Sequence, residues 1–319
     1  MGSCNGVFRS LDAETGKVRW ETSVRDQAAK QYFFHGDVFL APDRIVATAD
    51  VDTKTGAEAG MHAFDRNTGR HLWKYSAGRG VLGAVMGAGD RVFAYTATGD
   101  LVALNIGSGT TEWTYPVKAR AWESPGVLDG RVFGGSNDGS VYAFDGRTGR
   151  VLWQQKLGAS VATSIRATAS DLYVASADGT VYRLAPTSGE IRASINVDPV
   201  LTPISAPLVT PEAVLVLLAD NEVNYRAVVS LDPSLARVRW RQAAPDRWTT
   251  SRVFATPRTV VVGSPSGEVT AYCARDGAVA WSHKVASAPV RSIGGTEERL
   301  LVGTPQGSLY AIRPPTSCK

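Results

Sequence analysis

The feature that most constrains the fold is a ten-residue pattern that recurs seven times, with its copies ending 40 to 53 residues apart. Four clear copies start with an apolar residue, carry glycine at the sixth position and end in tryptophan, at residues 11–20, 64–73, 104–113 and 144–153. Weaker copies follow at 184–193, 231–240 and 272–281; the first ends in Ala193 and the second lacks its glycine. These spacings leave no room for a hidden unit, and such periodicity is typical of repeat architectures.

Each unit reads as a meander of short strands. Residues 130–155, GRVFGGSNDGSVYAFDGRTGRVLWQQ, alternate apolar runs with turns that contain Asp-Gly or Thr-Gly, and glycine allows the positive φ that tight hairpins require. Along SVYAFD (140–145) both alternating sets of side chains include apolar or aromatic residues, so both faces of the sheet must be covered. Radially stacked blades meet that need. The sequence therefore predicts an all-β chain, a single β-propeller domain over 1–319 with four-stranded antiparallel blades.

The recurring glycines and tryptophans are interpreted as structural. One tryptophan per repeat, instead of a cluster, favours a ring on each outer strand that fills the space between neighbouring blades over a ligand-stacking role. The predicted structural set is Gly16, Trp20, Gly69, Trp73, Gly109, Trp113, Gly149, Trp153, Trp240, Gly277 and Trp281.

The chain ends indicate how a ring would close. Residues 290–313 supply three strands and stop before any tryptophan-bearing strand, whereas the N-terminus begins with one at 18–22. The expectation is that this N-terminal strand completes the C-terminal blade, which gives seven blades. Because GVFRSL at 6–11 also reads as a strand, an eight-bladed ring with further upstream strands is the alternative.

Composition narrows the functional classes. A hydrophobic content of 44% with 20% charged residues indicates a soluble globular protein. The net charge of +4 comes from scattered Lys and Arg, so we expect no nucleic-acid partner. No apolar run approaches the roughly twenty residues of a membrane helix, and the N-terminus shows no signal peptide. We expect a monomer without a transmembrane segment.

Three cysteines, Cys4, Cys273 and Cys318, have no CxxC or CxxCH spacing. This excludes zinc-ribbon, thioredoxin-like and c-type haem classes. Ring closure would bring the chain ends together, so a Cys4–Cys318 clasp is one hypothesis, and two unpaired thiols are the other.

Candidate binding residues lie in the loops that join one blade to the next, which gather around the funnel of a propeller. Arginine beside an exposed aromatic ring suits an anionic small molecule or a carboxylate-bearing peptide; ordinary rim residues are the simpler interpretation. The candidates are His35, Arg79, Arg120, Trp122, Arg247, Trp248 and Arg291.

Metal and catalytic sites find little support in the sequence. The loop 48–60 carries Asp50, Asp52 and Glu58, which is only vaguely similar to a calcium loop, so a solvated hairpin is preferred. The four histidines, at 35, 62, 71 and 283, are interpreted as dispersed over separate units, so that neither a zinc cluster nor a Ser-His-Asp set is expected. We expect no metal site and no catalytic residue.

The recurring pattern apolar-Asp-x-x-Thr-Gly-x-x-x-Trp resembles the PQQ-like repeat of β-propeller proteins. Two branches of that superfamily are relevant: quinoprotein dehydrogenases, which hold pyrroloquinoline quinone and Ca²⁺, and BamB-like outer-membrane assembly lipoproteins. The chain has no adjacent cysteines of the dehydrogenase type, and RLLVGTPQGSLYAIR (299–313) resembles the end of BamB-like chains. The resemblance implies a non-enzymatic scaffold for a protein or peptide, in the periplasm or cell envelope, with no cofactor. A propeller that binds quinone or a small anion, as an enzyme or sensor, is the alternative.

Overall fold

The computed structural model describes residues 6–24, 33–34, 38–50, 59–78, 80–81, 83–119, 123–161, 163–203, 205–220, 225–248, 253–315 and 318, with only the backbone at 33, 50, 225 and 244–248. The described residues form strands and turns, with no helix among them. The chain divides into two compact units, Met1–Lys156 and Leu157–Lys319. A single domain over 1–319 stays a prediction.

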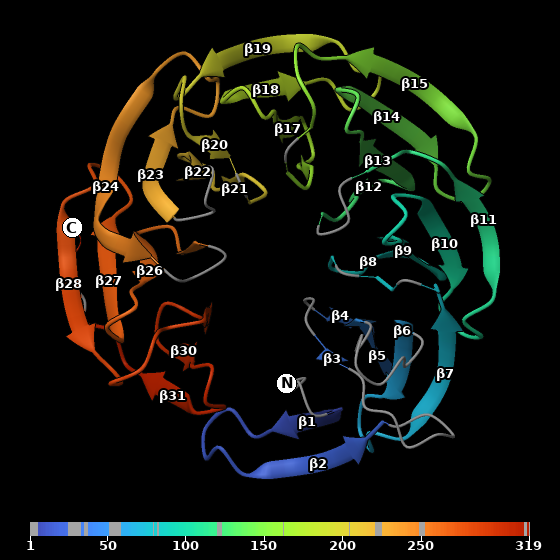
Figure 1. Cartoon of the computed structure of the whole chain (residues 1–319), viewed down its shortest axis with the longest axis horizontal. Helices are drawn as coiled ribbons and strands as arrows, with labels where there is room; N and C mark the ends of the chain where they lie inside the picture. Colours follow the sequence, from blue (N-terminus) through green and yellow to red (C-terminus); the bar gives the residue numbers. More distant parts are fainter. Residues whose placement is uncertain are drawn as a thin grey trace. The chain divides into compact units, whose positions relative to one another are not determined.

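Unit 1 contains four antiparallel sheets that follow one another in chain order (Figure 1). The first pairs β1 (Val7–Leu11) with β2 (Val18–Ser23). The second contains β3 (Phe33–Phe34), β4 (Phe39–Leu40), β5 (Arg44–Asp50), β6 (Gly60–Asp65) and β7 (His71–Ser76). The third contains β8 (Met86–Ala88), β9 (Arg91–Tyr95), β10 (Leu101–Asn105) and β11 (Thr111–Tyr115). The fourth contains β12 (Gly126–Leu128), β13 (Arg131–Gly135), β14 (Ser140–Asp145) and β15 (Val151–Lys156).

Unit 2 repeats this organisation. Its first sheet contains β16 (Arg166–Ala167), β17 (Leu172–Ala175), β18 (Thr180–Leu184) and β19 (Ile191–Asn196). Its second contains β20 (Thr202–Pro203), β21 (Leu208–Val209), β22 (Val214–Ala219), β23 (Tyr225–Leu231) and β24 (Val238–Trp248). Its third contains β25 (Phe254–Ala255), β26 (Thr259–Gly263), β27 (Glu268–Cys273) and β28 (Val279–Lys284). Its last contains β29 (Ser292–Gly295), β30 (Leu300–Gly303) and β31 (Leu309–Ile312).

Seven blades follow one another from β3 to β31, six with four or five strands and the last with three. The strand pairings among the described residues are antiparallel, as the meander pattern predicted. The strand expected at 6–11 is present as β1 and pairs with β2 in a separate sheet. Completion of the C-terminal blade by residues 18–22 would join the two units, and it stays a prediction.

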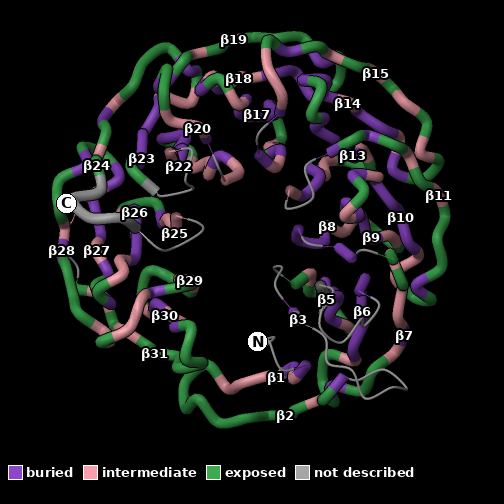
Figure 2. Tube along the Cα trace, in the orientation of Figure 1, coloured by how far each residue is buried: buried purple, intermediate pink, exposed green. Residues whose placement is uncertain are grey.

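The middle strands of the sheets are buried on both faces. In β14 and β10 the residues of both alternating sets are largely buried, and every residue of β22 is buried. The last strand of a sheet is more exposed, as in β15 and β19 (Figure 2). The two-sided apolar pattern of SVYAFD therefore reflects a sheet that is covered on both faces.

A single turn design explains the Asp-x-x-Thr-Gly pattern. In the turn between β6 and β7, the Asp65 carboxylate accepts hydrogen bonds from the Asn67 N–H, the Thr68 N–H and the Thr68 hydroxyl at 2.9–3.0 Å. The Gly69 N–H donates to the Asp65 carbonyl at 2.9 Å, and Gly69 has φ of +72°. Asp and Thr thus fold the backbone locally, and glycine adopts the left-handed conformation that closes the turn.

Four of the turn glycines also contact the tryptophan of the preceding sheet. The Trp73 indole N–H donates to the Ile106 carbonyl at 2.9 Å, and a Cβ added to Gly109 would lie 2.6 Å from the Trp73 ring. This tryptophan–glycine contact recurs between sheets within each unit, for Trp20 with Gly69, Trp113 with Gly149 and Trp240 with Gly277.

The two remaining tryptophans of the predicted set, Trp153 and Trp281, differ from these four. Trp153 packs against Phe133, with ring centroids 5.9 Å apart. Trp281 is buried in unit 2, yet its indole N–H finds no acceptor within the described ranges. The contribution of the whole set to stability stays a prediction.

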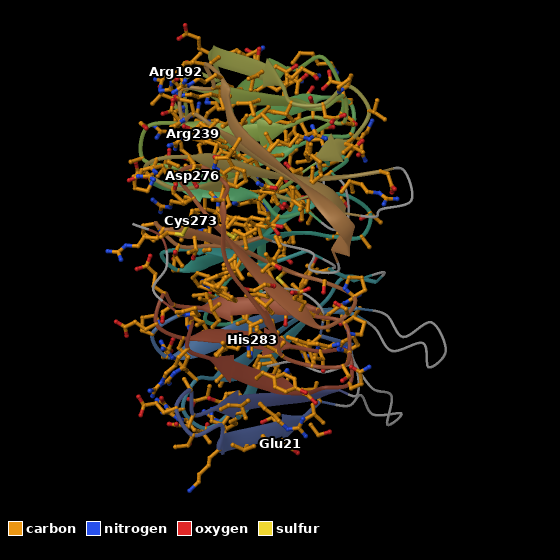
Figure 3. The ribbon with its side chains drawn as sticks, turned by 90° about the vertical axis from the view of Figure 1, so that its left-hand side faces the viewer. Glu21, Arg192, Arg239, Cys273, Asp276 and His283 are labelled. Atoms are coloured by element: carbon orange, nitrogen blue, oxygen red, sulfur yellow. A yellow bond between two sulfur atoms is a disulfide. The ribbon has the colours of Figure 1, made fainter. Side chains whose placement is uncertain are left out.

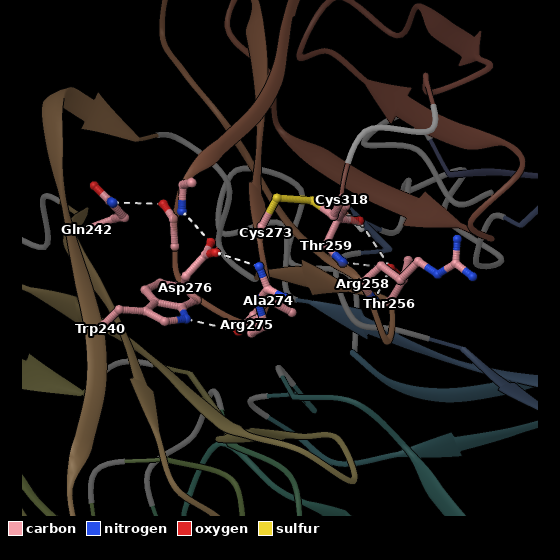
Figure 4. The surroundings of a disulfide bond; sticks show 12 residues. Trp240, Gln242, Thr256, Arg258, Thr259, Cys273, Ala274, Arg275, Asp276 and Cys318 are labelled. Carbon is pink, nitrogen blue, oxygen red and sulfur yellow. Dashed lines mark hydrogen bonds and ion pairs between the residues drawn. A yellow bond between two sulfur atoms is a disulfide. The ribbon is translucent and has the colours of Figure 1, made fainter.

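A disulfide joins Cys273, at the end of β27, to Cys318 in the C-terminal tail (Figure 4). Both hypotheses for Cys318, a clasp with Cys4 and an unpaired thiol, are therefore wrong, and Cys4 lies outside the described residues. Cys273 occupies the turn position that holds Asp65 in the second sheet, and the tail returns to it over 45 residues. Connectivity of this kind depends on the path of the chain and cannot be read from cysteine spacing.

We predict that Gly149→Ala destabilises the protein more than Gly16→Ala. Both glycines are sixth in their turns with φ near +70°, so each substitution costs about 1–2 kcal/mol for the left-handed conformation. Only at Gly149 does the new Cβ meet a ring, 2.7 Å from Trp113, whereas nothing lies within 4 Å at Gly16. The clash should add about 1–3 kcal/mol. Urea denaturation measures the difference, and equal losses would contradict it.

Candidate functional site

The predicted funnel-facing residues are mostly beyond what the structure describes. His35, Arg79, Arg120 and Trp122 lie outside the described residues, and Arg247 and Trp248 are described only by their backbone at the end of β24, where Trp248 pairs with Tyr225. Arg291 is exposed, and its N–H donates to the Gly303 carbonyl at 2.8 Å. The grouping of these residues into one site stays a prediction.

The acidic residues of the possible calcium loop are also largely outside the described residues. Asp50 ends β5 and is described only by its backbone, and Asp52 and Glu58 lie outside the described residues. Among the residues that are described, no group of three or more His, Cys, Asp or Glu side chains could hold a metal ion. No helix in this part of the chain has the length and apolar character needed to cross a bilayer.

Two histidines that the sequence analysis treated as dispersed are in contact. His62 on β6 and His71 on β7 place Nδ1 and Nε2 3.0 Å apart. They belong to one repeat, on either side of its turn, so their assignment to separate units was wrong. The contact follows from the hairpin, in which Phe64 pairs with His71 and the register shifts next to Phe64.

Burial sets the protonation of this pair. His62 is fully buried and stacks beside Phe64. Burial, followed by the nearby His71 and Lys74, lowers the pKa of His62 from 6.5 to about 3. Burial and Lys74 also lower the pKa of His71. Both rings are therefore neutral near pH 7, and one donates a hydrogen bond to the other.

One contact within unit 2 departs from the tryptophan–glycine design on both of its sides. On β19, Ala193 stands opposite Arg183, where other sheets place tryptophan opposite alanine or serine, as in Ala103 with Trp113 and Ser230 with Trp240. In the next sheet the turn carries Ala236 at the glycine position, and Leu235 adopts the positive φ of 61°. The two losses in the repeat pattern thus fall on the same contact between sheets.

Other side chains replace the missing ring. The Tyr173 hydroxyl on β17 donates to the Pro233 carbonyl at 2.8 Å, and Pro233 holds the turn position whose carbonyl accepts an indole N–H elsewhere, as Arg66 does from Trp20. Leu235 is buried against Tyr173 and Leu231. The sheets therefore remain packed, but by a tyrosine from an inner strand instead of a tryptophan from the outer one.

A charged cluster lies beside this contact. Arg183 Nε and Nη2 donate to the two oxygens of Asp171 at 2.8 and 3.1 Å, and Arg192 Nη1 donates to Asp171 Oδ1 at 2.8 Å. The Asp171 side chain is only 5% exposed. Burial opposes its ionisation, but hydrogen bonds from Arg183, Ser170 and Arg192 outweigh burial and lower the pKa of Asp171 below its usual value. Asp171 is therefore ionised at neutral pH.

A cavity of about 420 Å³ opens at the cluster. It lies between the β16–β17 turn and the turns of the following sheet, lined among others by Asp171, Tyr173, Arg183, Val209, Pro211 and Pro233. This site was not among the residues predicted from the sequence. The signal was present, because the copy without tryptophan and the copy without glycine are consecutive, and those two positions touch in the other contacts.

We expect stability to fall as the pH is lowered from 7 to 4.5, in part because of His62. The unfolded chain binds a proton there below pH 6.5, whereas folded His62 stays neutral down to about pH 3. The free energy of unfolding should lose about 2 kcal/mol from this group over that range. In the His62→Gln variant, urea titrations should show a flatter pH dependence. The exposed His283→Gln control should follow the wild type, and an unchanged slope for His62→Gln would refute the assignment.

The chain is similar to known proteins of one family. The family model described as outer membrane protein assembly factor BamB matches residues 57–199 and 137–316. The BamB of Moranella endobia (strain PCIT) is 22% identical over 330 residues, which cover 96% of this chain and 80% of that protein. Matches to the BamB of Yersinia pestis and of Escherichia coli (strain K12) cover 47% and 46% of those relatives, about half their length.

Two further similarities concern fold and activity. The crystal structure of BamB from Moraxella catarrhalis aligns with a TM-score of 0.76 and 19% identity, over 97% of this chain and 89% of that one. This likeness confirms the predicted fold class, an all-β propeller of antiparallel blades. A polyvinylalcohol dehydrogenase of Sphingopyxis sp. (strain 113P3) is 26% identical over 204 residues, 49% of this chain and 31% of that enzyme. Because the family model matches most of the sequence, the chain belongs to the family of the outer membrane protein assembly factor BamB.

Proposed function

We propose that the chain is a non-enzymatic propeller scaffold that binds a protein or peptide partner outside the cytoplasm, in the assembly of outer-membrane proteins. The observation that carries the proposal is the family match over residues 57–316. Relatives named as assembly factors in several organisms support it. A fold of this kind serves many tasks, so the partner has to be recognised by side chains at its surface.

The sheets themselves restrict where a partner can bind. Their middle strands are buried on both faces, so recognition falls to the turns, the connecting loops and the exposed last strands. Arg120 and Arg247 remain the proposed contact residues, although Arg247 lies at the end of β24 and not in a loop as predicted. A guanidinium pairs bidentately with a carboxylate, and an aromatic residue next to it in the sequence adds apolar area. A monomer and the lack of a nucleic-acid partner stay predictions.

A second candidate function is quinone-dependent oxidation, favoured by the similarity to a polyvinylalcohol dehydrogenase. Calcium and pyrroloquinoline quinone would need carboxylate or histidine ligands gathered in one place. The described residues offer no such group of three, and the sequence has no adjacent cysteines. The residues that the structure describes thus do not fit the cofactor, and its absence from the functional protein stays an expectation.

Capture from a cell-envelope extract tests the scaffold function. The full chain, immobilised and incubated with detergent-solubilised envelope, should retain a defined protein that crosslinking and mass spectrometry identify. The Arg120→Ala/Arg247→Ala variant should retain at least tenfold less of it, because two charged anchors are lost.

The matched control removes the same number of guanidinium groups elsewhere. Arg70→Ala/Arg150→Ala alters two exposed arginines in the outer turns and should capture as much as the wild type. Absence of any captured protein would overturn the proposal, as would dye reduction with an alcohol substrate that depends on added quinone and calcium.

A further inference from the structure

We propose that the 420 Å³ cavity beside Asp171 binds an acidic segment of a peptide, with the ligand carboxylate held by Arg183 and Arg192. The inference rests on the proposed function, that the chain binds protein partners, and it names the chemistry of one binding site.

The charges around the cavity favour an anion. Two guanidinium groups share the single carboxylate of Asp171. Asp232, next in the chain to the lining residue Pro233, accepts a hydrogen bond from the Ser234 hydroxyl at 2.6 Å and lies near the positive charges of Arg237 and Arg239. At Asp171 two arginines therefore meet one aspartate, an excess of one positive charge.

The arginines keep donors for a ligand. Arginine has five N–H groups; the bonds to Asp171 engage Nε and Nη2 of Arg183 and Nη1 of Arg192, which also reaches the Ser170 carbonyl at 2.7 Å. The Arg192 side chain is 40% exposed, and Figure 3 shows it on the same side of unit 2 as Arg239. A carboxylate that enters from solvent can pair with the remaining N–H groups.

The rest of the lining selects a partly apolar ligand. The hydroxyls of Tyr173, Ser170 and Ser234 already donate to Pro233, Asp171 and Asp232 respectively. The cavity thus offers guanidinium donors on one side and the carbon surfaces of Val209, Pro211 and Pro233 on the other. Its volume lies within the range of about 300–1,000 Å³ for small-ligand sites. A peptide in which acidic and apolar side chains alternate can pair with the guanidinium donors and also contact the carbon surfaces.

The ion cluster is costly as a packing device. The Asp171 carboxylate is buried, and a buried charge loses hydration that ion pairing only partly restores. Four other contacts between sheets use a tryptophan ring over glycine instead. Here Arg183 stands where Ala63 and Ala103 stand in other sheets, and its neighbour Ala193 leaves the ring position open. Replacement on both sides of one contact, next to a polar cavity, is the arrangement expected of a binding site.

Titration of the full chain with a defined peptide tests the inference. The probe is a capped hexapeptide of alternating Glu and Leu, and the same peptide with Gln in place of Glu is the uncharged comparison, both measured by isothermal titration calorimetry. We expect saturable binding of the Glu peptide and at least tenfold weaker binding of the Gln peptide. Tighter binding of succinate than of the Glu peptide would show that the site takes small acids, and would overturn the peptide assignment.

Variants locate the binding. Arg192→Gln should weaken the Glu peptide at least tenfold, and Arg70→Gln, an exposed arginine in an outer turn of unit 1, should not change it. Ala193→Trp/Ala236→Gly introduces the residues of the other contacts and should abolish binding, because the new indole would compete with Tyr173 for the carbonyl of Pro233, which lines the cavity. Unchanged affinity in Arg192→Gln, or no saturable binding by the wild type, would refute the inference.

Capture from envelope extract separates this inference from the proposed function. If the wild type captures a partner but does not bind the Glu peptide, the cavity assignment fails and the scaffold function stands. If the wild type captures nothing, the scaffold function fails whatever the peptide does.

Discussion

The contact of a tryptophan ring with a turn glycine is the interaction on which the packing of successive sheets depends. The ring of Trp73 covers Gly109 and its indole N–H reaches the Ile106 carbonyl, so one side chain both fills space and satisfies a backbone acceptor. Any residue larger than glycine would place a Cβ within the ring's van der Waals radius. The Asp and Thr of the turn then hold that glycine in its left-handed conformation.

The departure from this design is as informative as the design. Between β16–β19 and β20–β24, tryptophan and glycine are both absent. The Tyr173 hydroxyl donates the hydrogen bond to the turn carbonyl that an indole donates elsewhere. A charged cluster and a cavity lie beside this contact. Neighbouring sheets can thus pack through tryptophan and glycine or through Tyr173. The tryptophan–glycine contacts maintain the fold, and the contact made by Tyr173 leaves space for a ligand. The proposed site uses that freedom.

Much of the fold could be predicted because its determinants are local and periodic. Strands, turns and blade type follow from the spacing of Gly69, Trp73 and their counterparts. The remaining features depend on contacts between distant residues. Cys318 meets Cys273 only because the tail folds back. Asp171 and Arg192 are 21 residues apart and meet across one sheet. The contact of His62 with His71 is local and could have been predicted, because the two residues flank one turn of a single hairpin.

A double-mutant cycle on Trp73→Ala and Gly109→Ala tests the central claim most directly, with unfolding free energies from urea titration. When Trp73 is present, Gly109→Ala should clash with the ring. In the Trp73→Ala background, Gly109→Ala should cost only the free energy of the left-handed conformation, about 1–2 kcal/mol. The account predicts that the combined loss is smaller than the sum of the single losses by about 1–3 kcal/mol. Additive losses would show that ring and glycine act independently, and would contradict it.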